Sequence, residues 1–291
     1  MYTFHDIADV RAAVSRARTC GATIGYMVTT GGLHKAHAAL IEELGRHAQY
    51  IVVSNMPGMD CAVSRLSVNH TTEEDAKVCR AAGANVLYAP SAPSVYGVGD
   101  PNKLFNVKAL GTVSEVLEGC ARPHIMSNIA THLMRMFNIV QPDVAIFGEK
   151  DYQQFAAVRQ MVADLNMPIT LVSMTTLRAP DGLAYASRNS KLSERERLQA
   201  PALYAAMDVI RQGIRSGRTD YLQLEREATE YLTAQGLGPD YIETRRACDL
   251  ERPESTDDQL IVFGSAFLGA VRLVDTLRVN DPIEGVTVWP Y

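Results

Sequence analysis

The stretch 23–37 reads TIGYMVTTGGLHKAH, a short apolar run of strand-forming residues followed by two glycines and the start of a helical pattern. Apolar residues keep helical spacing from Leu33 to Leu44, and YIVVS at Tyr50–Ser54 is typical of a second buried strand. Two buried strands joined by a helix predict a parallel pair, because parallel strands need a crossover connection. The stretch therefore predicts an α/β fold.

The alternation of helical pattern and apolar run continues along the chain. A helical pattern at 73–82 precedes a strand candidate at 85–88, and another at 127–140 precedes 143–147. A further apolar run spans 169–174. This order predicts a parallel sheet covered by helices on both faces.

The pattern changes after residue 192. Ser193 opens a capped, charged helix that we expect to continue to about Gly213. Strand candidates follow at 241–244, 259–263 and 270–274. We therefore expect a sheet domain over 1–192 and a smaller α+β domain over 193–291, in which 280–291 forms a peripheral tail.

Composition and charge narrow the class of protein. Hydrophobic residues make up 47% of the chain and charged residues 21%, as in ordinary globular proteins. The net charge is −5 and no basic run stands out, so we expect no nucleic-acid partner. The five scattered cysteines lack the spacing of zinc sites or dithiols, and no apolar stretch suits a leader or a membrane span. These features predict a cytoplasmic protein with reduced thiols and no membrane association.

The turn after the first strand carries candidate phosphate-binding groups. In Thr29-Thr30-Gly31-Gly32 the glycines let the backbone approach a ligand, and free N–H groups at a helix start attract anions. His34 and His37 lie on one face of the first turn and can donate hydrogen bonds to one triphosphate. An isolated His-x-x-His is more often a metal pair or two surface histidines. Its position after a glycine-rich strand end favours the nucleotide.

A second candidate segment, Phe147–Gln154 (FGEKDYQQ), follows another apolar run, at the strand end where ligands bind in doubly wound sheets. Lys150 is expected to reach nucleotide phosphates, and Asp151 to orient that lysine or hold ribose. Gln154 can hydrogen-bond a polar substrate. Taken alone, Gly-Glu-Lys-Asp is more often a solvated turn.

A third segment has a turn signal at Pro180-Asp181-Gly182, followed by Ser187 beside Arg188. Alone it is an ordinary loop. Together the three segments place phosphate donors at three strand ends, which suits nucleotidyl transfer by positioning and charge stabilisation. The sequence contains no Walker loop, no G-x-G-x-x-G and no G-x-S-x-G elbow.

These motifs resemble the pantothenate synthetase family over about residues 3–279. The resemblance is carried by Leu117-Glu118-Gly119, FNIVQPD at 137–143, FGEKDYQQ at 147–154, Asp181-Gly182-Leu183 and Ser187-Arg188-Asn189. It implies a Rossmann-like nucleotidyltransferase domain with a small C-terminal domain, in a homodimer. It also implies that ATP and Mg²⁺ activate pantoate, a small hydroxy acid, as an acyl-adenylate. The amine of β-alanine then forms an amide, and AMP and pyrophosphate are released.

The resemblance also implies roles for single residues. The residues expected to act in catalysis are His34, His37, Lys150, Ser187 and Arg188. Those expected to bind the nucleotide are Thr29, Thr30, Gly31, Gly148, Lys150, Asp151, Ser187 and Arg188. Those expected at the substrates are Gln154, Cys61 and Tyr185. No protein side chain is expected to ligate a metal.

The chain departs from the family pattern mainly around the acid. Val28–Gly31 stands where the family has Pro-Thr-Met-Gly, and Ala36 replaces the glycine before the second histidine. The segment whose glutamine holds pantoate aligns with 56–62, which contains Cys61 and no glutamine. Tyr185 and Ala186 replace a methionine and a serine. Further departures lie at 68–70 and 124–128.

Two hypotheses follow for the substrates. Because loss of a buried amide can shift specificity strongly, the chain is expected to use a changed acid, amine or both. The alternative is a divergent pantothenate synthetase in which other residues hold pantoate. Two further classes stay open, a nucleotidyltransferase that forms no amide and a degenerate ATP-binding protein without catalysis. The retained His34, His37, Lys150 and Arg188 argue against the last.

Overall fold

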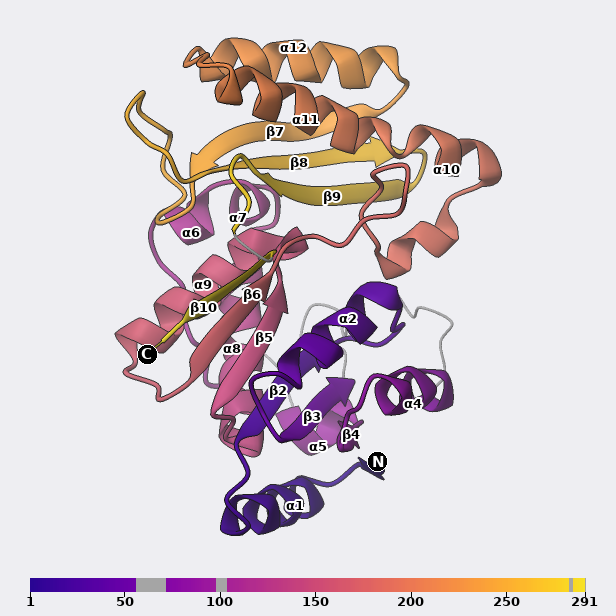
Figure 1. The fold of residues 1–291 in the computed structure, drawn as a ribbon, viewed down its shortest axis with the longest axis vertical. Helices are drawn as coiled ribbons and strands as arrows, with labels where there is room; N and C mark the ends of the chain where they lie inside the picture. Colours follow the sequence, from indigo (N-terminus) through magenta and orange to yellow (C-terminus); the bar gives the residue numbers. More distant parts are fainter. Residues whose placement is uncertain (56–71, 98–103, 283–284, 291) are drawn as a thin grey trace.

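The large domain is built around a seven-stranded sheet with the order β1-β4-β3-β2-β5-β6-β10, shown in Figure 1. The computed structural model describes residues 1–55, 72–97, 104–282 and 285–290. The strands are β1 (Tyr2–Phe4), β2 (Ile24–Thr29), β3 (Tyr50–Asn55), β4 (Val86–Tyr88), β5 (Val144–Gly148), β6 (Thr170–Met174) and β10 (Val286–Trp289). All neighbours pair in parallel except β10 with β6, so the predicted α/β class is confirmed.

Helices cover both faces of this sheet. The elements are α1 (Ile7–Thr19), α2 (Lys35–Leu44), α4 (Thr72–Ala81), α5 (Ala92–Tyr96), α6 (Thr112–Glu115), α7 (Glu118–Ala121), α8 (Ile125–Val140), the 3₁₀ turn η2 (Glu149–Asp151) and α9 (Tyr152–Asp164). Along β2, Tyr26 packs into the core under α1, α8 and α9, while Met27 packs into the core under α2 and α4. Successive strand residues point to opposite faces, so burial of both explains the continuous apolar run in the sequence.

The small domain is a three-stranded antiparallel sheet covered by helices. Its strands are β7 (Gly238–Arg246), β8 (Leu260–Leu268) and β9 (Val271–Arg278), and its helices are α10 (Glu194–Gln199), α11 (Ala202–Arg215) and α12 (Tyr221–Ala234). The 3₁₀ turn η3 (Ser187–Lys191) comes just before them in the chain. The prediction of a single helix from Ser193 to about Gly213 was wrong. The chain forms two helices there, α10 and α11, which are separated at Pro201. Proline has no N–H and its ring clashes with the preceding turn. The capping box of Ser193 and Glu196 is present at the start of α10.

The C-terminal tail returns to the large domain. Val286–Trp289 pair antiparallel with β6, from Val286 opposite Met174 to Trp289 opposite Leu171, so this segment is an edge strand rather than a peripheral tail. A buried ion pair also joins the domains, since Arg278 on β9 donates to Glu149 in η2 at 2.6 and 2.7 Å. The domain limit near residue 192 stays a prediction. None of the described helices is both long and apolar enough to cross a membrane.

Candidate active site

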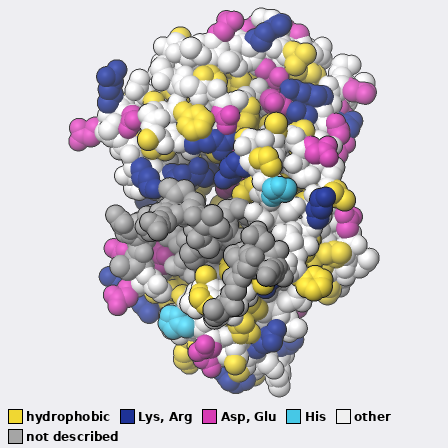
Figure 2. Space-filling model, turned by 180° about the vertical axis from the view of Figure 1, so that it is seen from behind, with side chains coloured by type: hydrophobic (Ala, Val, Ile, Leu, Met, Phe, Trp, Pro, Cys, Tyr) yellow, Lys and Arg dark blue, Asp and Glu magenta, His cyan; other side chains and the backbone are white. Residues whose placement is uncertain are grey.

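A cavity of about 400 Å³ lies at the carboxyl ends of β2 and β5, bounded also by the segment after β6 and by η3. Among its described lining residues are Thr30, His34, His37, Gly148, Lys150, Asp151, Gln154, Tyr185, Ser187 and Arg188. The structure thus brings together most of the residues singled out in the sequence. Figure 2 shows Lys and Arg side chains gathered between the small domain above and the large domain below.

The glycine turn after β2 is held by a carboxylate that the sequence analysis missed. Asp75 on α4 is fully buried and accepts hydrogen bonds from the backbone N–H groups of Gly32 (3.2 Å) and Leu33 (2.8 Å). Gly31 has a φ of +88°, and an added Cβ would lie 2.7 Å from Asn55 Oδ1, so only glycine fits there. The turn is therefore built for a fixed shape.

Hydrogen bonds within the turn engage the backbone groups that precede α2. The N–H groups of Gly31, Gly32 and Leu33 donate to Thr29 Oγ1 and Asp75, so these three donors are engaged within the protein. Thr29 is buried, and neither Thr29 nor Gly31 is among the described residues that line the cavity. From the first turn of α2, Ala36 and His37 line the cavity, and phosphate binding by this segment stays a prediction.

His34 and His37 lie side by side at the start of α2, with ring centroids 4.1 Å apart. Burial, reinforced by the neighbouring His34 and Lys150, lowers the pKa of His37 to about 3, so its ring is neutral at pH 7. His37 Nδ1 accepts the backbone N–H of His34 at 3.2 Å. The single proton of a neutral ring then sits on Nε2, which leaves His37 a hydrogen-bond donor for an anionic ligand.

Lys150, Asp151 and Gln154 lie where β5 passes through η2 into α9. Lys150 Nζ is 3.7 Å from Asp151 Oδ1, and the Asp151 side chain is half exposed. This long, open pair leaves the ammonium available to a phosphate. Two other polar residues of the motif do not line the cavity: Glu149 accepts hydrogen bonds from Arg278, and the buried Gln153 donates to the backbone carbonyls of Val113 and Val116.

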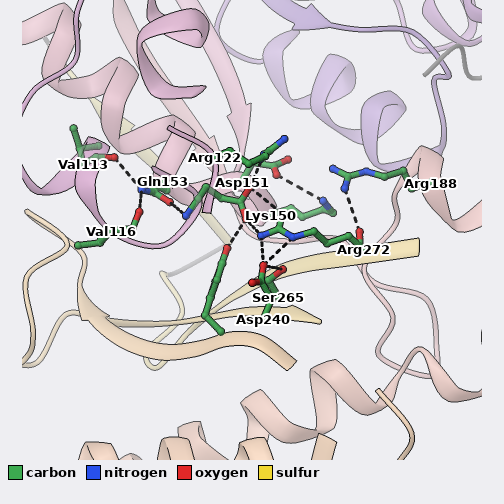
Figure 3. Close-up of polar contacts among 12 residues, drawn as sticks. Val113, Val116, Arg122, Lys150, Asp151, Gln153, Arg188, Asp240, Ser265 and Arg272 are labelled. Carbon is green, nitrogen blue, oxygen red and sulfur yellow. Dashed lines mark hydrogen bonds and ion pairs between the residues drawn. The ribbon is translucent and has the colours of Figure 1, made fainter. Parts of the chain in front are cut away.

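Tyr185, Ser187 and Arg188 come from the segment that enters the small domain. The ring of Tyr185 stacks toward His34 at 6.3 Å between centroids. Arg188 is exposed and donates from Nη1 to the backbone carbonyl of Arg272 at 3.1 Å, as Figure 3 shows. Arg122, which the sequence analysis did not single out, also lines the cavity. Cys61 and the departures at 68–70 lie outside the described residues.

The residues that line the cavity show what kind of metal ion it could hold. Within the described ranges no group of three or more His, Cys, Asp or Glu side chains could enclose a metal. Mg²⁺ commonly keeps several waters and is held by one or two carboxylates together with substrate phosphates. Asp151 supplies a half-exposed carboxylate at the cavity, so the residues fit an ion that enters with the nucleotide.

Comparison with known proteins places this arrangement in a family. The family model described as pantoate-beta-alanine ligase matches residues 2–278. The chain belongs to the pantoate–β-alanine ligase family. It is 39% identical to the pantothenate synthetase of Pseudomonas fluorescens strain Pf-5, over 96% of this chain and 98% of the relative. With that of Stutzerimonas stutzeri it shares 40% identity, over the same fractions.

Solved structures of pantoate–β-alanine ligases share the fold. The pantothenate synthetase of Thermus thermophilus superposes with a TM-score of 0.86 at 32% identity, covering 96% of this chain and 99% of the other. The ligase of Francisella tularensis, solved with β-γ ATP and β-alanine, gives a TM-score of 0.79 at 23% identity, covering 96% and 98%. The whole architecture, including the small antiparallel sheet, is therefore that of the family.

Proposed function

We propose that this protein is an ATP-dependent ligase that activates pantoate as an acyl-adenylate and condenses it with β-alanine. The observation that carries the proposal is the convergence of His34, His37, Lys150, Ser187 and Arg188 on one cavity at the strand ends. Neutral donors and cations fixed around a triphosphate supply the charge stabilisation that adenylate formation needs. Membership of the pantoate–β-alanine ligase family supports the same reaction.

The chemistry has two steps. A carboxylate oxygen of the acid attacks the α-phosphorus of ATP, and the bond between the α-phosphorus and the bridging oxygen to the β-phosphate breaks, releasing pyrophosphate. The neutral amine of β-alanine then attacks the adenylate carbonyl, an amide bond forms, AMP leaves and the amine loses a proton to solvent. Fixed geometry does most of this work, because no protein nucleophile is required.

The roles follow from position in the cavity. His37 donates from Nε2 to a phosphate oxygen while His34 holds the neighbouring position, and Lys150 and Arg188 neutralise charge on the departing pyrophosphate. Ser187 donates its hydroxyl to the triphosphate, and Gln154 hydrogen-bonds the acid. Mg²⁺ bound to the triphosphate would neutralise further phosphate charge, with Asp151 as the carboxylate available to it.

A second candidate is a ligase of the same type that uses a different small acid. Ala36, Tyr185 and Ala186, three of the departures from the family pattern, all line the cavity. Tyr185 is bulkier than the methionine it replaces, and Ala186 removes a hydroxyl. Such changes in lining can alter the acid that fits while leaving adenylation intact.

One assay separates these functions. Pyrophosphate release from ATP and Mg²⁺ is followed with pantoate and with a panel of small hydroxy and amino acids, each with and without β-alanine. Turnover with pantoate that yields an amide establishes the proposed reaction. Release with another acid alone establishes the second candidate. Adenylate or nucleotide transfer without amide, or no release at all, would refute both.

A homodimer in the cytoplasm completes the proposal. Phe105 and Leu110 are 97% and 63% exposed on an irregular segment before α6, which suits contact with a second copy better than contact with water. The described cysteines are free thiols, as reducing conditions require. Light scattering of the purified chain tests the dimer, and a monomer at micromolar concentration would refute it.

A further inference from the structure

A buried ion network joins the two domains beside the active site (Figure 3). Its centre is Glu118 on α7, whose side chain is 11% exposed. Glu118 Oε1 accepts hydrogen bonds from Arg272 Nη2 (2.7 Å) and Tyr241 OH (2.7 Å), and Oε2 accepts from Arg272 Nη1 (3.1 Å) and from Arg122. Burial alone would raise the pKa of Glu118, but the hydrogen bonds from Arg272 and Tyr241 outweigh it and lower the pKa to about 2. The carboxylate is therefore ionised at neutral pH.

Arg272 on β9 uses its guanidinium entirely within the protein. In addition to its two hydrogen bonds to Glu118, Arg272 donates from Nε and Nη2 to Asp240 Oδ2 at 2.9 and 2.5 Å. Glu118 and Arg272 are 154 residues apart in sequence, so this bidentate ion pair connects β9 of the small domain to α7 of the large domain. Because its donors are occupied, Arg272 is placed to hold structure rather than to bind phosphate.

Glu118, the large-domain partner of this ion pair, is held in place by further hydrogen bonds. The backbone N–H of Glu118 donates to Gln153 Oε1 at 3.0 Å, and Gln153 Nε2 donates to the carbonyls of Val113 and Val116 at 2.9 and 2.8 Å. Leu117 has φ 51° and ψ −120°, a conformation that disfavours any side chain. Strain of this kind persists only where the surroundings enforce it, so the position of Glu118 is tightly specified.

Arg272, the small-domain partner of this ion pair, contacts a residue of the proposed nucleotide site. The backbone carbonyl of Arg272 accepts the hydrogen bond from Arg188 Nη1, the only side-chain hydrogen bond of Arg188 within the part of the chain that the structure describes. We propose that Glu118 and Arg272 act as a positioning pair, which fixes β9 so that the Arg272 carbonyl aims the Arg188 guanidinium at the triphosphate. The inference rests on the ATP-binding role proposed for Arg188.

Affinity for ATP in a double-mutant cycle tests the pair, with ATP and Mg²⁺ titrated calorimetrically into the full chain. Glu118→Gln keeps the shape of the side chain but loses the charge that holds Arg272. We expect Glu118→Gln and Arg188→Ala each to weaken ATP binding by about tenfold. The double variant is expected to bind no more weakly than Arg188→Ala alone, because Glu118 acts through Arg188.

A matched control separates positioning from stability. Glu225 is another buried glutamate held by an arginine, Arg252, at 2.8 and 2.9 Å, but it lies within the small domain away from the cavity. Glu225→Gln is expected to lower the free energy of unfolding while leaving ATP affinity unchanged. If Glu118→Gln does not fold, Arg272→Lys replaces it in the cycle, since a lysine cannot form the two-pronged contact.

The outcomes are distinct. The positioning pair would be overturned if the fold-losses of ATP affinity in the two single variants multiply in the double variant, or if Glu118→Gln binds ATP with unchanged affinity. Either result would leave the proposed function in place. Unchanged affinity in Arg188→Ala would instead refute the ATP-binding role of Arg188, and the inference would fall with it. If Glu225→Gln weakens ATP binding as much as Glu118→Gln does, the effect of Glu118 would be explained by a general loss of stability, and the positioning role would be overturned.

Discussion

Leu33 donates its backbone N–H to Asp75 Oδ1 at 2.8 Å, although the two residues are 42 positions apart. The same carboxylate accepts from Gly32, so one buried acid on α4 fixes the turn that leads into His34. Backbone N–H groups buried without an acceptor are costly. The shape of the histidine turn therefore depends on a residue outside every motif recognised in the sequence.

Removal of this acid is expected to destabilise the protein. In Asp75→Ala, the N–H groups of Gly32 and Leu33 lose their acceptor in a buried position, which should lower the free energy of unfolding by about 3 kcal/mol. Adenylate formation should fall as well, because His34 and His37 lose their fixed start of α2. Urea unfolding and pyrophosphate release measure the two effects.

Glu73 provides the control on the same helix, because it is exposed. Glu73→Ala should leave both the free energy of unfolding and the activity near the wild-type values. Equal losses in the two variants would show that α4 is sensitive to any lost charge, and the specific role of Asp75 would be refuted.

The contrast between Asp75 and its neighbours shows what the sequence predicts and what it does not. Alternating apolar runs and helical patterns predicted the parallel sheet, because burial on both faces leaves a direct trace in β2, β3 and β5. Strand ends with glycine, histidine and lysine predicted which segments meet at the cavity. These are local signals, and each is complete within about fifteen residues of chain.

Long-range partners left no such trace. Asp75 lies in Thr-Glu-Glu-Asp-Ala-Lys, which has the composition of a solvated helix face, and only the packing of α4 beside α2 turns it inward. Arg272 lies in no recognised motif, and Glu118 lies in a family motif to which the sequence assigned no role. Their pairing is visible only once β9 docks on α7. The three-residue strand β1 is too short for a period to be recognised, and β10 is set by pairing with β6 rather than by its own pattern.

Loss of the cavity lysine should remove catalysis without unfolding the chain. Lys150 pairs only loosely with Asp151, so Lys150→Ala should change the free energy of unfolding by less than about 1 kcal/mol. Pyrophosphate release should fall by about a hundredfold or more, because a cation that stabilises departing phosphate charge is missing. Pyrophosphate release should fall to a similar degree in His34→Ala.

The control for charge alone is the exposed Lys77→Ala on α4, which should keep full activity. Circular dichroism with urea unfolding confirms the fold of each variant. Pyrophosphate release that survives in both Lys150→Ala and His34→Ala would contradict the roles assigned to the two residues.

Stability should fall in acid because of buried histidines. Burial, with Arg135 nearby, lowers the pKa of His132 to about 4, so the folded chain takes up this proton near pH 4 and the unfolded chain near pH 6.5. Between these values the unfolded state binds more protons. The contribution of His132 to the free energy of unfolding should therefore be level above pH 6.5 and fall by up to about 3 kcal/mol as the pH drops to 4.

A variant that cannot titrate isolates this contribution. His132 Nδ1 lies 2.5 Å from Tyr96 OH, and His132→Gln keeps a polar partner for that hydroxyl while removing the titrating ring. Its urea midpoint, measured from pH 7 to pH 4, should decline less steeply than that of the wild type. The exposed His5→Gln serves as control and should keep the wild-type profile. An unchanged slope in His132→Gln would assign the acid sensitivity to other groups, with buried His37 as the next to test.

The lining of the cavity should set the choice of acid. Tyr185 and Ala186 both line it where the family has methionine and serine, and the Tyr185 ring stacks toward His34. Reversal to the family residues in Tyr185→Met with Ala186→Ser restores a flexible side chain and a hydroxyl donor. We expect kcat/KM for pantoate to rise by about tenfold, since one well-placed hydrogen bond and relief of bulk in a pocket are worth this much.

The same change should leave the KM for ATP within about twofold of the wild type, because Lys150 and Arg188 are untouched. Leu222→Ser on α12, at a side chain that is 63% exposed and outside the cavity lining, provides a control that should leave the selectivity among acids unaltered. If kcat/KM for pantoate does not rise in the double variant, these two departures do not determine the acid. The divergent-synthetase hypothesis, in which other residues hold pantoate, would then account for them, provided that the wild type turns over pantoate efficiently.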